Sequence, residues 1–388
     1  MKLPQPIVRR VNDVFSDFLT RFLPVTLPHM KRLSYFITLL QFLIASGASA
    51  SPANASLIQK NYQLAVDKWA LDMRVSTSQD ERLKVWGERP DAAAAARKMW
   101  EQIGDSLDDE WTIPPAAWFL QNTQGLITTN PNGSTVPSFA KENDAIRKAI
   151  ETSHIHSSKL TPMCMALVAS QDPRSLAILE KIQASHPDKK IQGVAALGAA
   201  MQLKTIGDDP ELMKKRLTYL RKAIIQSSDV EINGTTVAKI AEDELYIIRY
   251  LTKGRVAPDL AGVDAANRPL SLAANNGKVI ILLFWSSSDP DATRVIDITA
   301  ALEKKFKGRP LVIIGVNHDP SEKLRAMQAD GTVTWSNFSD PENKLSAEYR
   351  VGSWPLVYVL DGDRKIHYAG APGSFVELTA EGLVTEIK

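Results

Sequence analysis

The chain has 388 residues, enough for two or three domains, and its 44% hydrophobic and 23% charged residues are ordinary for a globular protein with a sizeable core. Its formal net charge is +2, with nearly equal numbers of acids and bases, which argues against a dedicated nucleic-acid-binding protein. The single cysteine, Cys164, excludes both an intramolecular disulfide and a multi-cysteine zinc site.

The N-terminal region carries the pattern of an export signal. Within residues 30–50, two basic residues precede an apolar run at 33–45 and a small-x-small cleavage site that ends at Ala50. We therefore expect a protein exported to the periplasm or the extracellular space. If the segment is not cleaved, residues 33–45 would act as a membrane anchor. Residues 1–29 are either an N-terminal extension or a mis-assigned start, with Met30 as the true initiator.

Residues 51–254 read as one helical domain, because apolar residues recur there at three- and four-residue spacing. Acidic residues paired with prolines predict helix starts, and glycines predict helix ends. The starts are Asp172-Pro173, Pro187-Asp188 and Asp209-Pro210, the ends are Gly207 and Gly254, and residues 91–98 are a strong helix-forming run. Successive helices with short joints predict either a solenoid of stacked pairs or an irregular bundle.

Three features of this helical domain could carry a function. Residues 122–140, rich in Asn, Thr, Gly and Pro, predict a long loop. Cys164 lies in an apolar helical run and is expected to be a buried small hydrophobe; a reactive thiol would need a nearby cation, which the local sequence lacks. His154 and His156 are expected at the surface, since no third metal ligand is identifiable. The sequence predicts no metal and no cofactor.

From Ala257 the apolar pattern changes to that of an α/β domain. Continuous apolar runs predict buried parallel strands at 279–285 and in "PLVIIGVNHD". Around them we expect a hairpin with its turn near 265–268, a helix at 290–307, a helix from Pro320, a hairpin with its turn at Asp361-Gly362, and a closing helix in "GSFVELTAEGLVTEI". The predicted order is β-β-β-α-β-α-β-β-α.

Several separated motifs in this region carry a family resemblance. The stretches "APDL", "GKVIILLFW" and "YRVGSWPLVYVLDGDRKI" resemble the redoxin branch of the thioredoxin superfamily, the TlpA-like and AhpC/TSA-like domains. The resemblance covers residues 257–388 and implies an α/β thioredoxin-like domain. It matches Pro355 to the family's cis-proline. It also matches Trp354 to the residue before that proline, which in the family lines the substrate site.

The segment "FWSSSDPDA" departs from the family pattern. Alignment on Phe284-Trp285 puts Asp289 and Ala292 at the positions of the family's two cysteines. Thiol–disulfide exchange proceeds through a mixed disulfide, which an aspartate cannot form.

The segment has two interpretations. In the first it only caps a helix, with Ser288 or Asp289 as N-cap, Pro290 at N1 and Asp291 in the first turn, so that the helix end lowers the pKa of Asp289. In the second, the former active-site cleft binds a ligand through Trp285, Ser286, Ser287, Ser288, Asp289, Trp354 and Pro355. His318, which ends the next strand, is the one spatially plausible histidine for a hydrolytic site.

The sequence therefore predicts an exported redoxin-fold protein with a degenerate active site that binds a protein or peptide, or serves as a scaffold, without catalysis. The alternative is a divergent thiol–disulfide oxidoreductase of the TlpA-like family. A third is a structural solenoid capped by the C-terminal domain. The expected partner is a protein or peptide; nucleic acid is not expected, and a membrane only if the signal segment is uncleaved.

Overall fold

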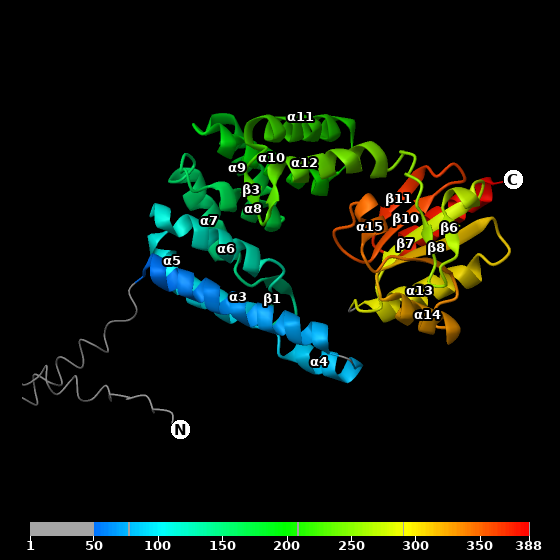
Figure 1. Cartoon of the computed structure of the whole chain (residues 1–388). Helices are drawn as coiled ribbons and strands as arrows, with labels where there is room; N and C mark the ends of the chain where they lie inside the picture. The colour runs from blue at the N-terminus through cyan, green and yellow to red at the C-terminus, as the bar shows by residue number, and fades with distance from the viewer. Residues whose placement is uncertain (1–49, 77, 208, 290, 388) are drawn as a thin grey trace, which may run out of the picture. The chain divides into compact units, whose positions relative to one another are not determined.

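A computed structural model describes residues 50–76, 78–207, 209–289 and 291–387 (Figure 1). The predicted signal segment, apart from its last residue, and Pro290 lie outside the described residues. The chain divides into two compact units between Glu142 and Asn143.

The first unit is a group of helices with one β-hairpin. Ser51, Ser78 and Asp91 cap its first three helices with their side-chain oxygens. The helices are α3 (Pro52–Val75), α4 (Gln79–Gly87), α5 (Ala92–Ile103) and α6 (Ile113–Thr123), with 3-10 turns at Gly104–Ser106 and Glu110–Thr112. The helix-forming run at 91–98 is confirmed as the start of α5.

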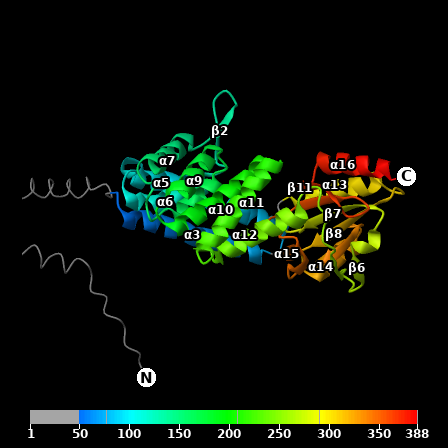
Figure 2. The ribbon, with the colours of Figure 1, turned by 90° about the horizontal axis from the view of Figure 1, so that it is seen from above.

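The prediction of a long loop at 122–140 is wrong. Strands β1 (Ile127–Thr129) and β2 (Thr135–Pro137) pair antiparallel, and the hairpin projects from the helices (Figure 2). The tight turn is closed by a hydrogen bond from the Gly133 amide to the Asn130 carbonyl, with φ of 81° at Gly133. The same Asn, Gly and Thr residues that read as a loop thus form a turn between two short exposed strands.

The second unit begins with a set of helices around α10. These are α7 (Ala140–Thr152), α8 (Thr161–Ala169), α9 (Arg174–Ser185), α10 (Lys189–Ile206), α11 (Pro210–Ser227) and α12 (Val237–Tyr246), which continues as a π-helical turn, Ile247–Leu251. A hairpin of β3 (Glu231–Ile232) and β4 (Thr235–Thr236) precedes α12. Helix α10 packs against α8, α9 and α11. The predicted caps Asp188, Asp209 and Gly207 are confirmed, whereas Asp172 accepts from the Arg174 amide and Pro173 is the N-cap of α9.

The buried cysteine prediction is confirmed, and half of the histidine prediction is wrong. Cys164 in α8 is fully buried, and burial raises the pKa of its thiol to about 12. His156 is exposed as expected, but His154 is 5% exposed and belongs to the interior. Within the described part of the chain, no group of three or more His, Cys, Asp or Glu side chains could hold a metal ion.

The C-terminal part is built on a five-stranded sheet in the order β11-β10-β7-β8-β9. Strands β7 (Val279–Trp285), β8 (Leu311–Asn317) and β9 (Ser336–Ser339) are parallel, and β10 (Leu356–Leu360) and β11 (Ile366–Gly370) are antiparallel to their neighbours. The helices are α13 (Ala292–Lys305), α14 (Ser321–Ala329), α15 (Lys344–Glu348) and α16 (Ser374–Glu386). A hairpin of β5 (Ala261–Val263) and β6 (Pro269–Ser271) and a 3-10 turn, Ala273–Asn275, come first.

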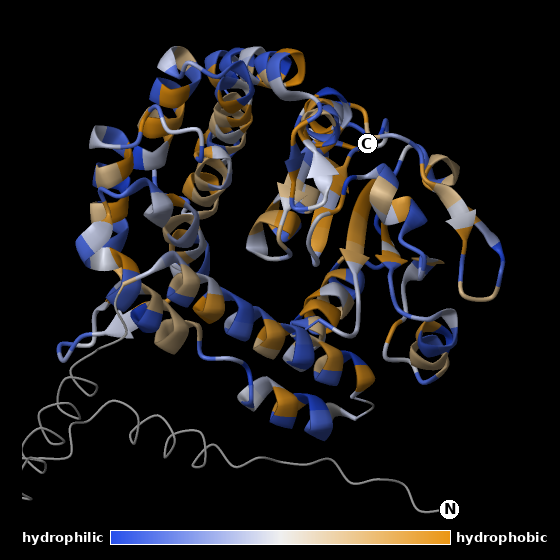
Figure 3. Ribbon diagram, turned by 60° about the vertical axis from the view of Figure 1, so that its left-hand side comes forward, coloured by the Kyte–Doolittle hydropathy of each residue, from blue (hydrophilic) through white to orange (hydrophobic). Residues whose placement is uncertain are grey.

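The central strand β7 is buried on both faces, as its continuous apolar run predicted. Figure 3 shows the hydrophobic colour of the strands in the middle of the sheet. Val279, Ile281, Leu283 and Trp285 point into one core, which α13 and α16 cover. The alternate residues Ile280, Leu282 and Phe284 point into a second core, which α15 covers together with Leu251 of the π-helical turn. This contact of Leu251 joins the last helices to the sheet, and both belong to the compact unit that begins at Asn143.

Two short elements of this part of the chain were not predicted. The sequence pattern missed β9 and α15, because each is short and flanked by polar residues. The predicted turn at Asp361-Gly362 is confirmed, and its left-handed residue is Arg364, with φ of 63°. Gly362 allows close packing, since a Cβ there would lie 3.0 Å from the Gly277 Cα.

A glycine in β8 protects a buried hydrogen bond. The Trp285 indole donates to Asn337 Oδ1 at 2.9 Å, and a Cβ on Gly315 would lie 1.8 Å from that oxygen. We expect Gly315→Ala to lower the free energy of unfolding by about 3 kcal/mol, because overpacking adds to the loss of the hydrogen bond. Gly382→Ala in α16 meets nothing within 4 Å and should raise it by up to about 1 kcal/mol. Urea denaturation of both variants measures these changes, and a neutral Gly315→Ala would contradict the packing argument.

Candidate functional site

Three loops meet at the carboxyl end of β7. Strands β7 and β8 are parallel and end at Trp285 and Asn317, so the segments that follow them lie side by side. Strand β10 runs antiparallel to β7 and places Leu356 opposite Phe284, which brings the preceding residues, Trp354 and Pro355, to the same edge. We call this region, Ser286–Asp289 with His318, Asp319, Trp354 and Pro355, the candidate site.

The buried carboxylate of Asp319 holds the segment after β7 in place. It accepts hydrogen bonds from the Ser286 hydroxyl at 3.0 Å, the Ser287 amide at 2.8 Å and the Ser288 hydroxyl at 3.3 Å. Asn317 Nδ2 adds a fourth donor at 2.9 Å, and Lys323 Nζ lies 3.7 Å away. Burial opposes ionisation of Asp319, but these hydrogen bonds and the Lys323 charge outweigh it and lower its pKa.

The proline loop packs against the end of β8. The peptide bond between Trp354 and Pro355 is cis, as the resemblance predicted. The Trp354 and His318 rings stack, with centroids 5.2 Å apart and planes 10° apart. The His318 amide donates to the Trp285 carbonyl at 3.1 Å, so Trp354 is positioned through His318 by the end of β7.

The helix-cap interpretation of Asp289 is wrong. Helix α13 begins at Ala292 with Asp291 as N-cap, and the Asp291 carboxylate accepts from Arg294 and not from the helix backbone. The Ala292 amide donates to the Asp289 main-chain carbonyl, so the Asp289 side chain is left outside the helix end. The predicted fall of its pKa is also wrong: burial, with the neighbouring Asp319 charge, raises the pKa of Asp289.

Trp285 does not belong to the surface of the candidate site. Its side chain is 1% exposed, donates to Asn337 and packs against Trp335 with ring centroids 5.8 Å apart. The structure brings together the other predicted residues, from Ser286 to Asp289 with Trp354 and Pro355. It adds Asp319, which sequence reasoning missed. The signal available was a second polar run directly after a buried parallel strand, where ligand sites of α/β sheets lie.

The arrangement lacks the geometry of a hydrolase. A nucleophilic serine needs a histidine within hydrogen-bond reach. The Ser286 and Ser288 hydroxyls instead bond to Asp319, and His318 Nδ1 lies 3.3 Å from the Asp340 carbonyl oxygen. Within the part of the chain that the structure describes, no Ser–His hydrogen bond is formed at this edge of the sheet.

Three buried polar atoms of the candidate site have no hydrogen-bond partner among the described residues. They are Ser287 Oγ, Asp289 Oδ2 and Trp354 Nε1. Buried polar atoms in native proteins are paired in the great majority of cases, and each exception calls for an explanation. Here the exceptions come from two separate loops that meet at one edge of the sheet, and they include both donors and acceptors.

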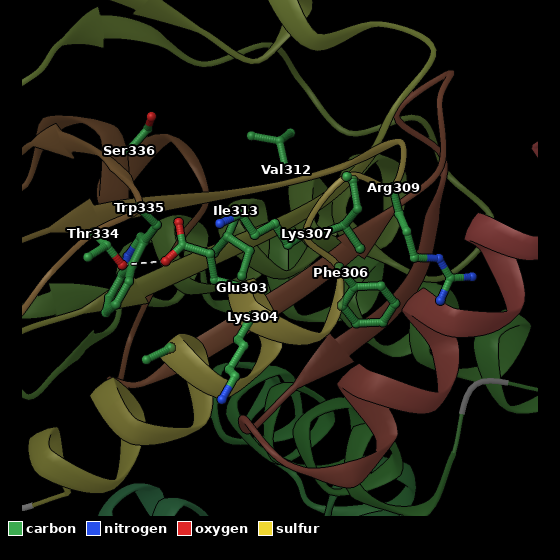
Figure 4. Close-up of a pocket in the computed structure, with 13 residues that line it drawn as sticks. Glu303, Lys304, Phe306, Lys307, Arg309, Val312, Ile313, Thr334, Trp335 and Ser336 are labelled. Atoms are coloured by element: carbon green, nitrogen blue, oxygen red, sulfur yellow. Dashed lines mark hydrogen bonds between the residues drawn. The ribbon is translucent and has the colours of Figure 1, made fainter.

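A hollow at the opposite end of the sheet is lined by polar side chains that do not point toward a common centre. It measures about 560 Å³ and lies where α13 ends and β8 begins (Figure 4). Glu303 accepts a hydrogen bond from the Thr334 hydroxyl, while the Lys304 and Arg309 side chains extend in different directions. Lys304 lies in the last turn of α13, where its charge offsets the helix dipole. This hollow is therefore not the candidate site.

Comparison with known proteins agrees with the fold. Residues 253–369 match the AhpC/TSA family. Residues 253–369 therefore form a thioredoxin-like redoxin domain. The cis-proline and the five-stranded sheet, apart from its last residue Gly370, lie in this redoxin domain; α16 follows it and a largely helical region precedes it.

Individual relatives cover only this domain. The chain is 28% identical to peroxiredoxin Q of Sedum lineare over 108 residues, which are 28% of this chain and 58% of that protein. It is 26% identical to the thioredoxin-like protein YneN of Bacillus subtilis over 115 residues, 29% of this chain and 66% of that protein. The chain thus spans less than two thirds of the length of these curated relatives.

Solved structures give similar partial matches. A thiol:disulfide interchange protein from Bacteroides sp. aligns over 36% of this chain and 93% of its own, with 24% identity and a TM-score of 0.32. The thioredoxin domain of a thiol-disulfide oxidoreductase from Bacteroides vulgatus aligns over 34% and 99%, with 24% identity and a TM-score of 0.31. Within the described ranges of our chain, no helix is long and apolar enough to cross a membrane.

The environment of Asp289 makes a pH-dependent prediction. The pKa of Asp289 is raised in the folded state. Its contribution to the free energy of unfolding is therefore fully present below the unfolded-state pKa and is lost as the pH rises through the folded-state pKa. Asp289→Asn should therefore raise the free energy of unfolding at pH 7 and have little effect at pH 3. Asp291→Asn removes an exposed carboxylate whose surface ion pair with Arg294 contributes little, and is the matched control, with little change expected at either pH. Loss of stability in Asp289→Asn at pH 7 would restore the capping interpretation.

Proposed function

We propose that the redoxin domain binds a polypeptide at the candidate site and does not turn over thiols or disulfides. Thiol–disulfide exchange and thiol peroxidase chemistry both require an accessible thiolate. The chain's single cysteine, Cys164, is fully buried in α8, and its thiol pKa of about 12 disfavours the thiolate at neutral pH.

The resemblance to redoxins supports a site that has lost its dithiol. Alignment on Phe284-Trp285 places Asp289 and Ala292 at the two cysteine positions. Asp289 lies three residues before Ala292, which is the first residue of α13. In this proposal the site keeps the position of a family active site and has exchanged its chemistry.

The observation that carries the proposal is the set of buried polar atoms without partners. Leaving such an atom unsatisfied costs about 1–3 kcal/mol, and a ligand that supplies the missing partner recovers part of that cost. Ser287 Oγ and Trp354 Nε1 are donors, and Asp289 Oδ2 is an acceptor or, when protonated, a donor. An extended polypeptide presents alternating N–H and C=O groups and can satisfy both kinds.

We further propose that the protein is exported. Residues 30–50 have the order of a cleaved signal peptide, and a chain without spare thiols suits an oxidising compartment. Retention of residues 33–45 would instead anchor the protein to a membrane. Sizing of the mature N-terminus by mass spectrometry separates a cleaved signal, expected to leave Ser51 first, from a retained anchor.

An insulin-reduction assay tests the loss of redox chemistry. The wild-type protein and Cys164→Ala should both fail to reduce insulin. Asp289→Cys combined with Ala292→Cys rebuilds the family's dithiol and should gain activity, because it supplies both the attacking and the resolving thiol that disulfide exchange requires. Reduction of insulin by Cys164→Ala would overturn the proposal. A double variant that folds without gaining activity would show that the geometry has changed together with the residues.

Calorimetric titration tests polypeptide binding. The probe is reduced and alkylated insulin B chain, an unfolded polypeptide that cannot exchange disulfides. Asp289→Asn and Ser287→Ala should each weaken binding about three- to tenfold, the effect of losing one hydrogen bond. Asp291→Asn, which removes an exposed carboxylate two residues away, should bind like the wild type. Binding that is equal in all four proteins would place the ligand elsewhere.

A further inference from the structure

A large groove lies between the last helix of the helical region and the redoxin domain, beside the proline loop but outside the candidate site. Its volume is about 1130 Å³, larger than the 300–1,000 Å³ typical of small-molecule pockets. One wall is α12 with the π-helical turn, from Lys239 to Lys253. The other wall is the redoxin segment from Ala347 to Tyr358 with part of β11.

Both walls carry apolar side chains that remain half-buried. Ile240 and Ile247 come from the helical wall, and Val351 and Leu356 come from the redoxin wall. Ile247, Val351 and Leu356 also pack against the second core of the sheet, so they are fixed in position. The groove therefore has an apolar floor that still presents surface to a partner.

The charges around the groove are unequal. Five cations line it, Lys204, Arg216, Lys239, Lys253 and Arg350, against two carboxylates, Asp243 and Glu244. Each carboxylate is shared by two cations: Asp243 by Lys239 and Arg350, and Glu244 by Lys204 and Arg216. Lys253 forms no ion pair with any residue that the structure describes. Because Arg216 is buried, the cations that reach the surface outnumber the carboxylates by two, and this excess favours a ligand with carboxylates.

The walls are held by one residue of the redoxin domain. Arg350 donates to Asp243 at 2.6 Å and to the Ala347 carbonyl at 2.6 Å, and its guanidinium lies 4.2 Å from the centroid of the Tyr246 ring. These contacts join α12 to the segment before the proline loop. A groove whose walls are fixed before binding loses less entropy when a ligand enters.

We propose that this groove binds an extended acidic segment of a partner protein, in which carboxylate side chains alternate with apolar ones. The apolar side chains enter between Ile240, Ile247, Val351 and Leu356, and the carboxylates reach the basic rim at Lys204, Lys239 and Lys253. The groove lies outside the candidate site, and neither Ser287 nor Asp289 lines it. This inference therefore does not depend on the proposed function.

Fluorescence anisotropy with labelled ten-residue peptides tests the proposal on the full chain. In the first peptide Glu alternates with Leu; in the second Lys replaces Glu; in the third Ser replaces Leu. The Glu–Leu peptide should bind at least tenfold more tightly than either of the other two peptides. Its affinity should fall as the salt concentration rises. Equal binding of the first and third peptides, or preference for the second, would overturn the proposal. So would full competition by free glutamate, which would indicate a small-molecule site.

Variants locate the binding. Lys253→Glu and Ile240→Gln should each weaken the Glu–Leu peptide about tenfold. Lys307→Glu changes an exposed lysine at the other hollow and is the matched control, with unchanged affinity expected. If Lys253→Glu and Lys307→Glu weaken binding equally, the peptide responds to the net charge of the protein and not to the groove, and the proposal fails. A concentration-dependent dimer that Lys253→Glu abolishes would assign the groove to a second copy instead.

Discussion

The carboxylate of Asp319 sets the conformation of the segment after β7. It gathers donors from three consecutive residues, Ser286, Ser287 and Ser288, and so turns the chain back toward the end of β8. A buried charge is tolerable only when hydrogen bonds replace its lost hydration, which is the arrangement here. With this segment turned, Asp289 lies outside the helix end, and the start of α13 moves to Ala292.

The two aspartates of the site therefore have opposite tendencies. Hydrogen bonds keep Asp319 ionised, while burial and the Asp319 charge favour protonation of Asp289. Acidification protonates Asp289 before Asp319, so the hydrogen bonds that Asp319 accepts from the loop remain in place. The loop thus keeps its shape over the range in which Asp289 changes its charge, and any ligand held by Asp289 experiences a change of charge without a change of backbone.

The sequence predicted the elements whose pattern is local. The run from Val279 to Trp285 has apolar residues at every position, and Pro355 sits in a recognisable motif, so both β7 and the cis-proline could be read directly. The position of Asp319 could not, because its importance comes from donors 31 to 33 residues away in the chain. Trp285 was predicted to line the cleft, but its side chain points into a core. Its hydrogen-bond partner Asn337 is 52 residues away in the chain, so this contact could not be predicted either.

The helix cap failed for a physical reason. Ser, Asp and Pro before an apolar run are strong local signals for a helix start, and in isolation each would favour Asp289 as a cap. The Ser286 and Ser288 hydroxyls instead donate to Asp319, and this tertiary interaction accompanies a helix start at Ala292. Local preference settled the type of element, and long-range hydrogen bonding settled its boundary.

Because Cys164 is buried, its reactivity reports on the opening of the helices around it. The thiol lies in α8 against α10, and its side chain has no exposed surface. A thiol reagent can reach it only when these helices open, so in the native protein the labelling rate equals the opening equilibrium multiplied by the intrinsic reaction rate. Since the chain has one cysteine, the signal needs no engineering and no correction for other sites. Labelling with and without a ligand of the redoxin domain would reveal whether the helices and the sheet share one free energy of opening.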